Sequence, residues 1–219
     1  MMLVLYGPTT TGKTDLAIKL AIKFNGEIIS ADSRQVYKGL DVGTGKVSSS
    51  KDVKKNDSFW IVDGIKINGF DLIIPPSVFT ASDFLNFCQE KITEIENKHK
   101  LPIIVGGTGF YIKSLLSGLG TQGIPPNPKL RQELENQTVD QLYKKLEELN
   151  QNRAQSMNKS DRSNPRRLIR AIEVAMSGKK QDHLATNQSS DILTIGLTAP
   201  NAHLFKKADI AFEKRQQGM

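Results

Sequence analysis

The stretch that most constrains the fold is residues 7–14, which read GPTTTGKT. An apolar run at 2–6 precedes it, and the residues after it show the apolar spacing of a helix. The shared face of that helix consists of Leu16, Ala17, Leu20, Ala21 and Phe24. A strand, a Gly-rich loop and a helix in this order are the context of a phosphate-binding loop.

Each residue type in the loop has a physical reason. Gly7 and Gly12 permit the turn that points successive N–H groups into one concavity, where the helix N-terminus adds its positive dipole end. Lys13 supplies a positive charge for a terminal phosphate, and the Thr14 hydroxyl can ligate Mg²⁺. The predicted phosphate-binding residues are Gly7, Pro8, Thr9, Thr10, Thr11, Gly12, Lys13 and Thr14. The pattern predicts a polyphosphate or diphosphate ligand and does not specify a nucleotide.

Charge and cysteine usage narrow the class of protein. Lys and Arg number 30 against 23 Asp and Glu, a formal charge of +7 that fits a polyanionic partner such as nucleic acid. A basic surface without a partner is the alternative. Cys88 is the only cysteine, so an intramolecular disulfide is excluded and a reducing cytoplasm is expected. No apolar run approaches the roughly 20 residues of a membrane span, and no signal peptide or membrane association is expected.

Two further strand ends carry candidate chemistry. A buried strand at 27–30 leads to Asp32, and another at 101–105 leads to a Gly-rich turn with Thr108 and then to a helix. The pattern predicts an α/β fold, a P-loop NTPase-like parallel sheet flanked by helices. Ligands of such sheets bind at the carboxyl ends of the strands, so Asp32 and Thr108 should share one edge with the loop. Asp32 is a candidate general base, Mg²⁺ partner or turn cap; Thr108 could face the anion or simply lie in a tight turn.

The remaining chain predicts a helical insertion within the α/β core. Residues 1–119 should form the first part of the core, 120–163 the helical insertion, and 164–219 the return to the core. Within the first part, 36–58 reads as a polar loop, strands are expected at 59–62 and 70–74, and a helix that buries Cys88 should follow Thr80. The helix that begins at Asn164 and Pro165 carries Arg166, Arg167 and Arg170 in its first turns. Because cations oppose the dipole there, the arginines suggest an anionic ligand, with a solvated basic face as the alternative.

Taken together, these stretches resemble the tRNA dimethylallyltransferases. The match is collinear up to about Leu197. It is carried by GPTTTGKT at 7–14, ADSRQVYKGLDVGTGK at 31–46, PPSVFTASDF at 75–84, LPIIVGGTGFYIKSLLSGL at 101–119 and NPRRLIRAIEV at 164–174.

The resemblance implies a reaction in which dimethylallyl diphosphate donates its five-carbon group to the exocyclic amine of the adenosine 3′ to the anticodon. By matched position, Asp32 would accept the amine proton and Thr108 would donate to the bridging oxygen. Lys13 would neutralise the leaving diphosphate directly, and Thr14 would do so through Mg²⁺. The implied tRNA-binding residues are Asp32, Ser33, Arg34, Gln35, Arg166, Arg167, Leu168, Ile169 and Arg170. A monomer is expected, whose helical insertion would be mobile and contact the anticodon stem-loop.

The chain departs from the family near its end. The family continues beyond residue 219, and it shows two arginines, four apart, after a Leu-aromatic pair. After Leu204 and Phe205 those positions are Lys207 and Ala211; Lys207 can substitute for an arginine, whereas Ala211 cannot. This departure suggests one alternative, a truncated RNA-binding remnant with weak activity. A second alternative is a P-loop kinase of a small metabolite, against which the stretches ADSRQVY and GGTGFYIK argue.

Overall fold

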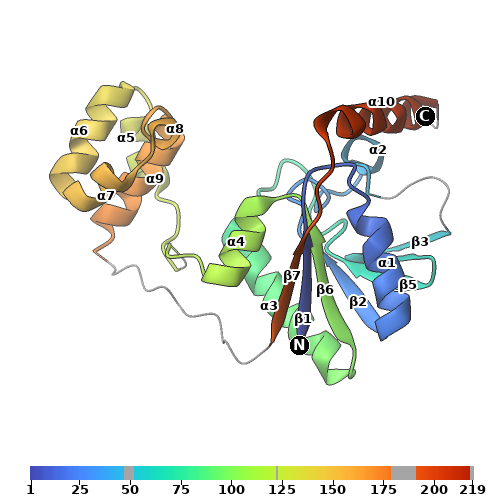
Figure 1. Ribbon diagram of the computed structural model, residues 1–219. Coiled ribbons are helices and arrows are strands. Elements are labelled where there is room, and N and C mark those ends of the chain that lie inside the picture. The colour runs from blue at the N-terminus through green and yellow to red at the C-terminus, as the bar shows by residue number, and fades with distance from the viewer. Residues whose placement is uncertain (47–51, 122, 179–190, 218–219) are drawn as a thin grey trace. The chain divides into compact units, whose positions relative to one another are not determined.

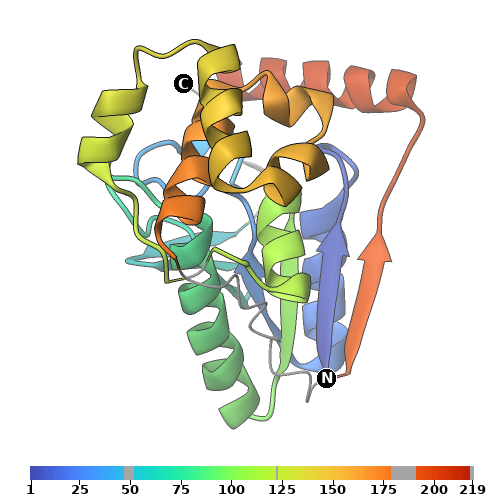
Figure 2. The ribbon, with the colours of Figure 1, turned by 90° about the vertical axis from the view of Figure 1, so that its left-hand side faces the viewer.

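The computed structural model describes residues 1–46, 52–121, 123–178 and 191–217. Contacts divide the chain into two compact units. The α/β unit comprises Met1–Gly118 and Ala185–Met219, and the helical unit comprises Leu119–Leu184. Each unit is described by itself (Figures 1 and 2).

The α/β unit is built on one sheet with the strand order β3-β4-β5-β2-β6-β1-β7. Its strands are β1 (Met2–Tyr6), β2 (Gly26–Ser30), β3 (Val53–Asn56), β4 (Phe59–Val62), β5 (Ile65–Asn68), β6 (Leu101–Gly106) and β7 (Ile192–Gly196). The run from β5 to β7 is parallel, which confirms the predicted parallel sheet. Pairing of β3 with β4 and of β4 with β5 is antiparallel, so an antiparallel ribbon extends one edge.

Helices cover both faces of this sheet (Figure 1). The unit contains α1 (Lys13–Phe24), α2 (Asp41–Thr44), α3 (Ala81–Asn97), α4 (Gly109–Ser117) and α10 (Asn201–Gln217). Leu3 and Leu5 of β1 pack in one core cluster with Ala17 and Ala21 of α1, as the alternation of side chains along a strand requires. The α3 and α4 helices lie on the opposite side of the sheet from α1.

Most of the expected burial in the first and third helices is confirmed. Thr80 and Asp83 form the capping box that starts α3, and Cys88 is fully buried. Burial raises the pKa of the Cys88 thiol to about 12, so it stays protonated and inert. The expected helix face of α1 is wrong at one position, because Phe24 is 52% exposed and Ile18 is buried instead.

The prediction of a strand at 70–74 is wrong. The strand that follows β4 and pairs with it is β5, at Ile65–Asn68. Asp63 and Gly64 have positive φ values of 49° and 79°, as in the two-residue turn that an Asp-Gly pair favours. Strand pairing therefore resumes directly after Gly64. Further along, Asp71 has a left-handed φ of 57°, which interrupts extended backbone in the apolar run.

The polar loop expected at 36–58 is also only partly correct. It contains the short helix α2 and the strand β3, and residues 47–51 lie outside the described residues. Only one of the four β3 residues is apolar, so the strand has no alternating pattern of its own. Its pairing with β4 creates the strand: Lys55 faces Trp60 in the register, and its Nζ lies 4.6 Å from the Trp60 ring centroid.

The helical unit packs short helices around a leucine-rich core. Its helices are α5 (Pro128–Leu134), α6 (Val139–Leu149), α7 (Gln151–Ser156), α8 (Lys159–Arg162) and α9 (Pro165–Met176). The predicted capping box of Thr138 with Gln141 and the Asn164 cap are both present. The structure moves one predicted boundary: α9 belongs to this unit, because Leu168 and Ile172 pack with the buried leucines of α5 and α6.

A buried carboxylate on α9 ties this unit together. The Glu173 side chain is 1% exposed, and its Oε1 accepts hydrogen bonds from the Asn127 N–H at 2.9 Å and from Arg131 Nε at 2.7 Å. Its Oε2 accepts from Arg131 Nη2 at 2.9 Å and from Arg170 Nη1 at 3.0 Å. Burial alone would raise the pKa of Glu173, but these hydrogen bonds outweigh it and lower the pKa from 4.5 to about 2.

We expect Glu173→Gln to destabilise the helical unit by about 2–4 kcal/mol at neutral pH, because it removes one partner of a buried charged pair. The folded pKa is depressed, so this contribution is complete above pH 4.5 and disappears as the pH falls toward about 2. Urea unfolding of wild type and variant across that range measures the difference. A constant difference at all pH values would contradict the ionised pair.

Candidate functional site

The loop at residues 7–14 connects β1 to α1 through two glycines with positive φ. Gly7 has φ 150° and Gly12 has φ 82°, and no side chain caps the N-terminus of α1. The N–H groups at the start of this helix are thus without a side-chain cap and can serve an anion. A Cβ on Gly7 would lie 2.2 Å from the Leu197 carbonyl oxygen, so glycine is needed there for the close approach of the chain after β7.

The Lys13 ammonium contacts the backbone of the phosphate loop. Its Nζ donates to the Pro8 carbonyl oxygen at 2.6 Å. Burial lowers the pKa of Lys13, while the charge of Asp32 opposes that shift. The parallel pairing of β1, β6 and β2 places Asp32, after β2, at the same sheet edge as the phosphate loop. A partly dehydrated ammonium also attracts an anion more strongly than a fully solvated one.

Asp32 caps the turn that follows β2. Its Oδ1 accepts from the Arg34 N–H at 2.9 Å, which confirms the turn-cap role among the three predicted roles. A carboxylate has further lone pairs, and the Asp32 side chain is half-buried. The base and Mg²⁺ roles are compatible with this geometry and stay predictions.

Thr108 contacts the same turn from the neighbouring strand. Its Oγ1 accepts from the Ser33 N–H at 3.0 Å and lies 3.3 Å from Ser33 Oγ. The Thr108 hydroxyl therefore joins the turn after β6 to the turn after β2. A Cβ on Gly106 would lie 2.0 Å from the Ala31 carbonyl oxygen, so this glycine permits the approach.

The implied RNA-contacting turn uses some of its side chains internally. The Gln35 side chain accepts from Ser30 Oγ at 2.8 Å and donates to the carbonyl oxygens of Thr44 and Gly45 at 3.5 and 3.4 Å. Arg34 is exposed. Arg34 is therefore the exposed side chain of this turn, whereas Gln35 must leave its partners to contact RNA.

The predicted RNA-contacting residues of α9 also divide by environment. Arg170 binds Glu173 and the Ile124 carbonyl oxygen, the latter at 2.8 Å, and Arg167 pairs with Asp161. Arg166 is exposed and has no polar partner among the described residues. Carboxylates of the chain itself thus neutralise two of the three arginines near the start of α9, and for these two no external anion is needed.

Two of the residues implied to bind tRNA are apolar and pack in or against the core of the helical unit. Leu168 has no exposed surface and belongs to the core of the helical unit, so it cannot touch RNA in this structure. Ile169 is partly buried against the same core. They hold α9 in place and thereby support the arginines.

The chain after β7 returns to the phosphate loop. Thr10 Oγ1 donates to the Leu204 carbonyl oxygen of α10 at 3.1 Å. Lys207 is exposed, and Ala211 is half-buried. The contact places the N-terminal part of α10 beside the loop.

Neither a metal cluster nor a membrane span is found in the described residues. No group of three or more His, Cys, Asp or Glu side chains there could hold a metal ion. No helix in the same part of the chain is long and apolar enough to cross a membrane.

Sequence comparison finds one family and close relatives. A family model described as IPP transferase matches residues 35–218. The tRNA dimethylallyltransferase of Clostridioides difficile is 35% identical over 217 residues, covering 95% of this chain and 66% of the relative. That of Finegoldia magna is 39% identical over 212 residues, covering 94% and 64%. The chain thus spans slightly less than two thirds of the length of these relatives.

Solved structures agree with the sequence comparison. The full-length tRNA isopentenylpyrophosphate transferase of Bacillus halodurans superimposes with a TM-score of 0.62 at 29% identity, covering 99% of this chain and 66% of the other. A eukaryotic dimethylallyltransferase acting on tRNA gives 0.76 at 27% identity, covering 99% and 54%. The predicted fold class is therefore confirmed.

Proposed function

The chain belongs to the IPP transferase family, and from that premise we propose that it transfers a dimethylallyl group from dimethylallyl diphosphate to tRNA. The acceptor is the exocyclic amine of the adenosine 3′ to the anticodon. The observation that carries this proposal is geometric: Lys13, Thr108 and Asp32 follow the carboxyl ends of the neighbouring parallel strands β1, β6 and β2, and Thr108 Oγ1 accepts from the Ser33 N–H at 3.0 Å. A phosphate cradle beside a carboxylate suits the displacement of diphosphate by an amine.

The phosphate loop supports departure of the leaving group. As the bond between the allylic carbon and the diphosphate oxygen breaks, negative charge grows on that oxygen. Lys13 and the N–H groups at the start of α1 neutralise this charge. Thr108 donates its hydroxyl proton in a hydrogen bond to the bridging oxygen, after turning from Ser33.

Asp32 acts on the acceptor. Its carboxylate accepts the proton lost by the exocyclic amine as the new carbon–nitrogen bond forms. The adenine must leave its stack to reach the turn, which costs a few kcal/mol. Contacts of arginines such as Arg34 and Arg166 with backbone phosphates offset that cost.

The donor set fits one Mg²⁺ held mostly by substrate. Mg²⁺ binds through few protein groups, keeps several waters and takes phosphate oxygens. Thr14 lies half-buried in the first turn of α1 and would provide the hydroxyl ligand when the ion is bound. The ion supplies positive charge that stabilises the departing diphosphate.

Mass spectrometry of tRNA nucleosides after incubation of the chain with dimethylallyl diphosphate and Mg²⁺ tests the proposed function. Prenylated adenosine is the expected product, and Lys13→Ala should abolish it. Lys19→Ala changes an exposed lysine six residues further along the same helix; it is the matched control and should retain the product. ATP turnover on a small acceptor without prenylation would support a kinase instead, and tRNA binding without any product would indicate an RNA-binding remnant.

Arg166 should contribute one phosphate contact. Arg166→Gln is expected to lower the slope of log affinity for tRNA against log salt by about one, because one fewer counterion is released. Arg170 is the control, because it binds Glu173 within the helical unit. Arg170→Gln should lower the stability of that unit. Filter binding over a salt series measures the slope, and an unchanged slope for Arg166→Gln would return this residue to a solvated basic face.

A further inference from the structure

A fully buried lysine ends the segment 31–46, which also carries Asp32. The Lys46 side chain has no exposed surface, and its Nζ has three acceptors. These are Asp41 Oδ1 at 2.6 Å, Asp71 Oδ1 at 2.5 Å and the Tyr37 carbonyl oxygen at 2.8 Å. An ammonium has three N–H donors, so every donor of this buried cation is used.

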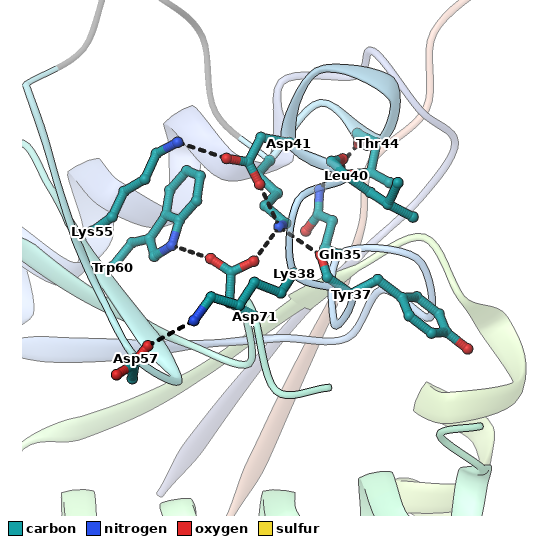
Figure 3. A network of polar contacts seen from close by, with 11 residues as sticks. Gln35, Tyr37, Lys38, Leu40, Asp41, Thr44, Lys55, Asp57, Trp60 and Asp71 are labelled. Carbon is teal, nitrogen blue, oxygen red and sulfur yellow. Dashed lines mark hydrogen bonds and ion pairs between the residues drawn. The ribbon is translucent and has the colours of Figure 1, made fainter. Parts of the chain in front are cut away.

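The same network continues to the antiparallel ribbon (Figure 3). Asp71 Oδ2 accepts from Trp60 Nε1 at 2.6 Å, and Asp41 Oδ2 accepts from Lys55 Nζ at 2.6 Å. Figure 3 shows the Asp41 and Asp71 carboxylates directed toward a common point between them. Two lysines and two aspartates balance in charge, which reduces the cost of burying them.

This network closes the segment that carries the candidate base. Residues 31–46 leave the sheet after β2, and Lys46 binds back to Tyr37 and Asp41 within that segment. Asp71 joins it a second time, because its N–H donates to the Gln35 carbonyl oxygen at 3.4 Å. The loop bearing Asp32 is thus clamped at its far end by one cation.

We propose that Lys46 is a positioning residue, which holds the turn at 32–35 in the geometry needed for transfer through the contacts of Asp41, Asp71 and Tyr37. This inference rests on the proposed function for its effect on rate. A burial role alone could be filled by an apolar side chain at lower desolvation cost. The charge instead gives three directional hydrogen bonds, which fix a loop more narrowly than apolar packing can.

The test uses Lys46→Met, together with Lys46→Met/Asp71→Asn, which also removes one carboxylate left without its cation. We expect the single-turnover transfer rate of both variants to fall by about 10²-fold, the typical cost of misplacing a reacting group by about 1 Å. Diphosphate affinity should not change, because the phosphate loop is a separate segment. Lys55→Met is the matched control, because Lys55 binds the same Asp41 but its own side chain is 57% exposed. The transfer rate of this variant should stay within about twofold of wild type.

Hydrogen exchange gives a readout independent of activity. In the double variant, the Ser33 and Arg34 amides, which are bonded to Thr108 and Asp32, should exchange faster, while those of α1 should not. A double variant with the wild-type rate, or with wild-type exchange at these amides, would overturn the inference and leave Lys46 a structural residue. If the wild-type chain transfers nothing, the proposed function fails, and the exchange experiment still decides the positioning role.

Discussion

Asp32→Asn is expected to lower the single-turnover rate of transfer by about 10²–10⁴-fold, the usual contribution of a general base. The substitution is well matched to the structure, because an asparagine oxygen can still accept the Arg34 N–H that Asp32 Oδ1 accepts at 2.9 Å. The turn should therefore persist while proton acceptance is lost. Rapid-quench measurement of prenylated tRNA with saturating enzyme isolates this step.

Two companion measurements separate the other roles of Asp32. If the carboxylate mainly organises Mg²⁺ beside Thr14, diphosphate affinity should fall and added Mg²⁺ should partly restore the rate. Asp32→Ala also removes the side chain that caps the turn, which should lower the free energy of unfolding by about 0.5–2 kcal/mol. A near wild-type rate for Asp32→Asn would remove this residue from the catalytic set.

Gly106→Ala is expected to destabilise the α/β unit by about 3 kcal/mol, near the upper end of overpacking costs. The new Cβ would lie 2.0 Å from the oxygen and 2.5 Å from the carbon of the Ala31 carbonyl group. Both are backbone atoms, so β2 and β6 must separate at their carboxyl ends. Denaturant unfolding measures the loss.

The next glycine in the same turn is the control for Gly106. A Cβ on Gly107 would meet only the Gly7 carbonyl oxygen, at 3.6 Å, which is ordinary contact. Gly107→Ala should therefore change stability by no more than about 1 kcal/mol. Equal effects of the two substitutions would show that backbone freedom, and not the approach of Ala31, is the reason for glycine at 106.

Local signals in the sequence were sufficient for the elements that carry the site. The phosphate loop with its flanking strand and helix, the Gly-rich turn before α4 and the capping box at Thr80 all follow from adjacent residues. Parallel pairing then places the carboxyl ends of β1, β2 and β6 at one edge. For this reason the proximity of Lys13 and Asp32 was predictable before any contact was known.

The sequence missed features that depend on distant partners. Strand β3 exists because β4 pairs with it, and the break at Asp71 reflects packing that the apolar run 70–74 does not reveal. Glu173 resembles any helical glutamate until Arg131 is seen beside it. Likewise, nothing adjacent to Gln35 indicates that its amide faces inward toward Gly45.

By itself, then, the sequence determined the phosphate loop, the α/β class, the sheet edge that carries the site and the resemblance to a family. Only the tertiary structure decided that Lys46 is buried between Asp41 and Asp71, and that α9 belongs to the helical unit. The physical reason is the range of the interactions. Turns, caps and periodic faces are stabilised by neighbours in the chain, whereas a buried charge is tolerated only where remote segments bring its hydrogen-bond partners together.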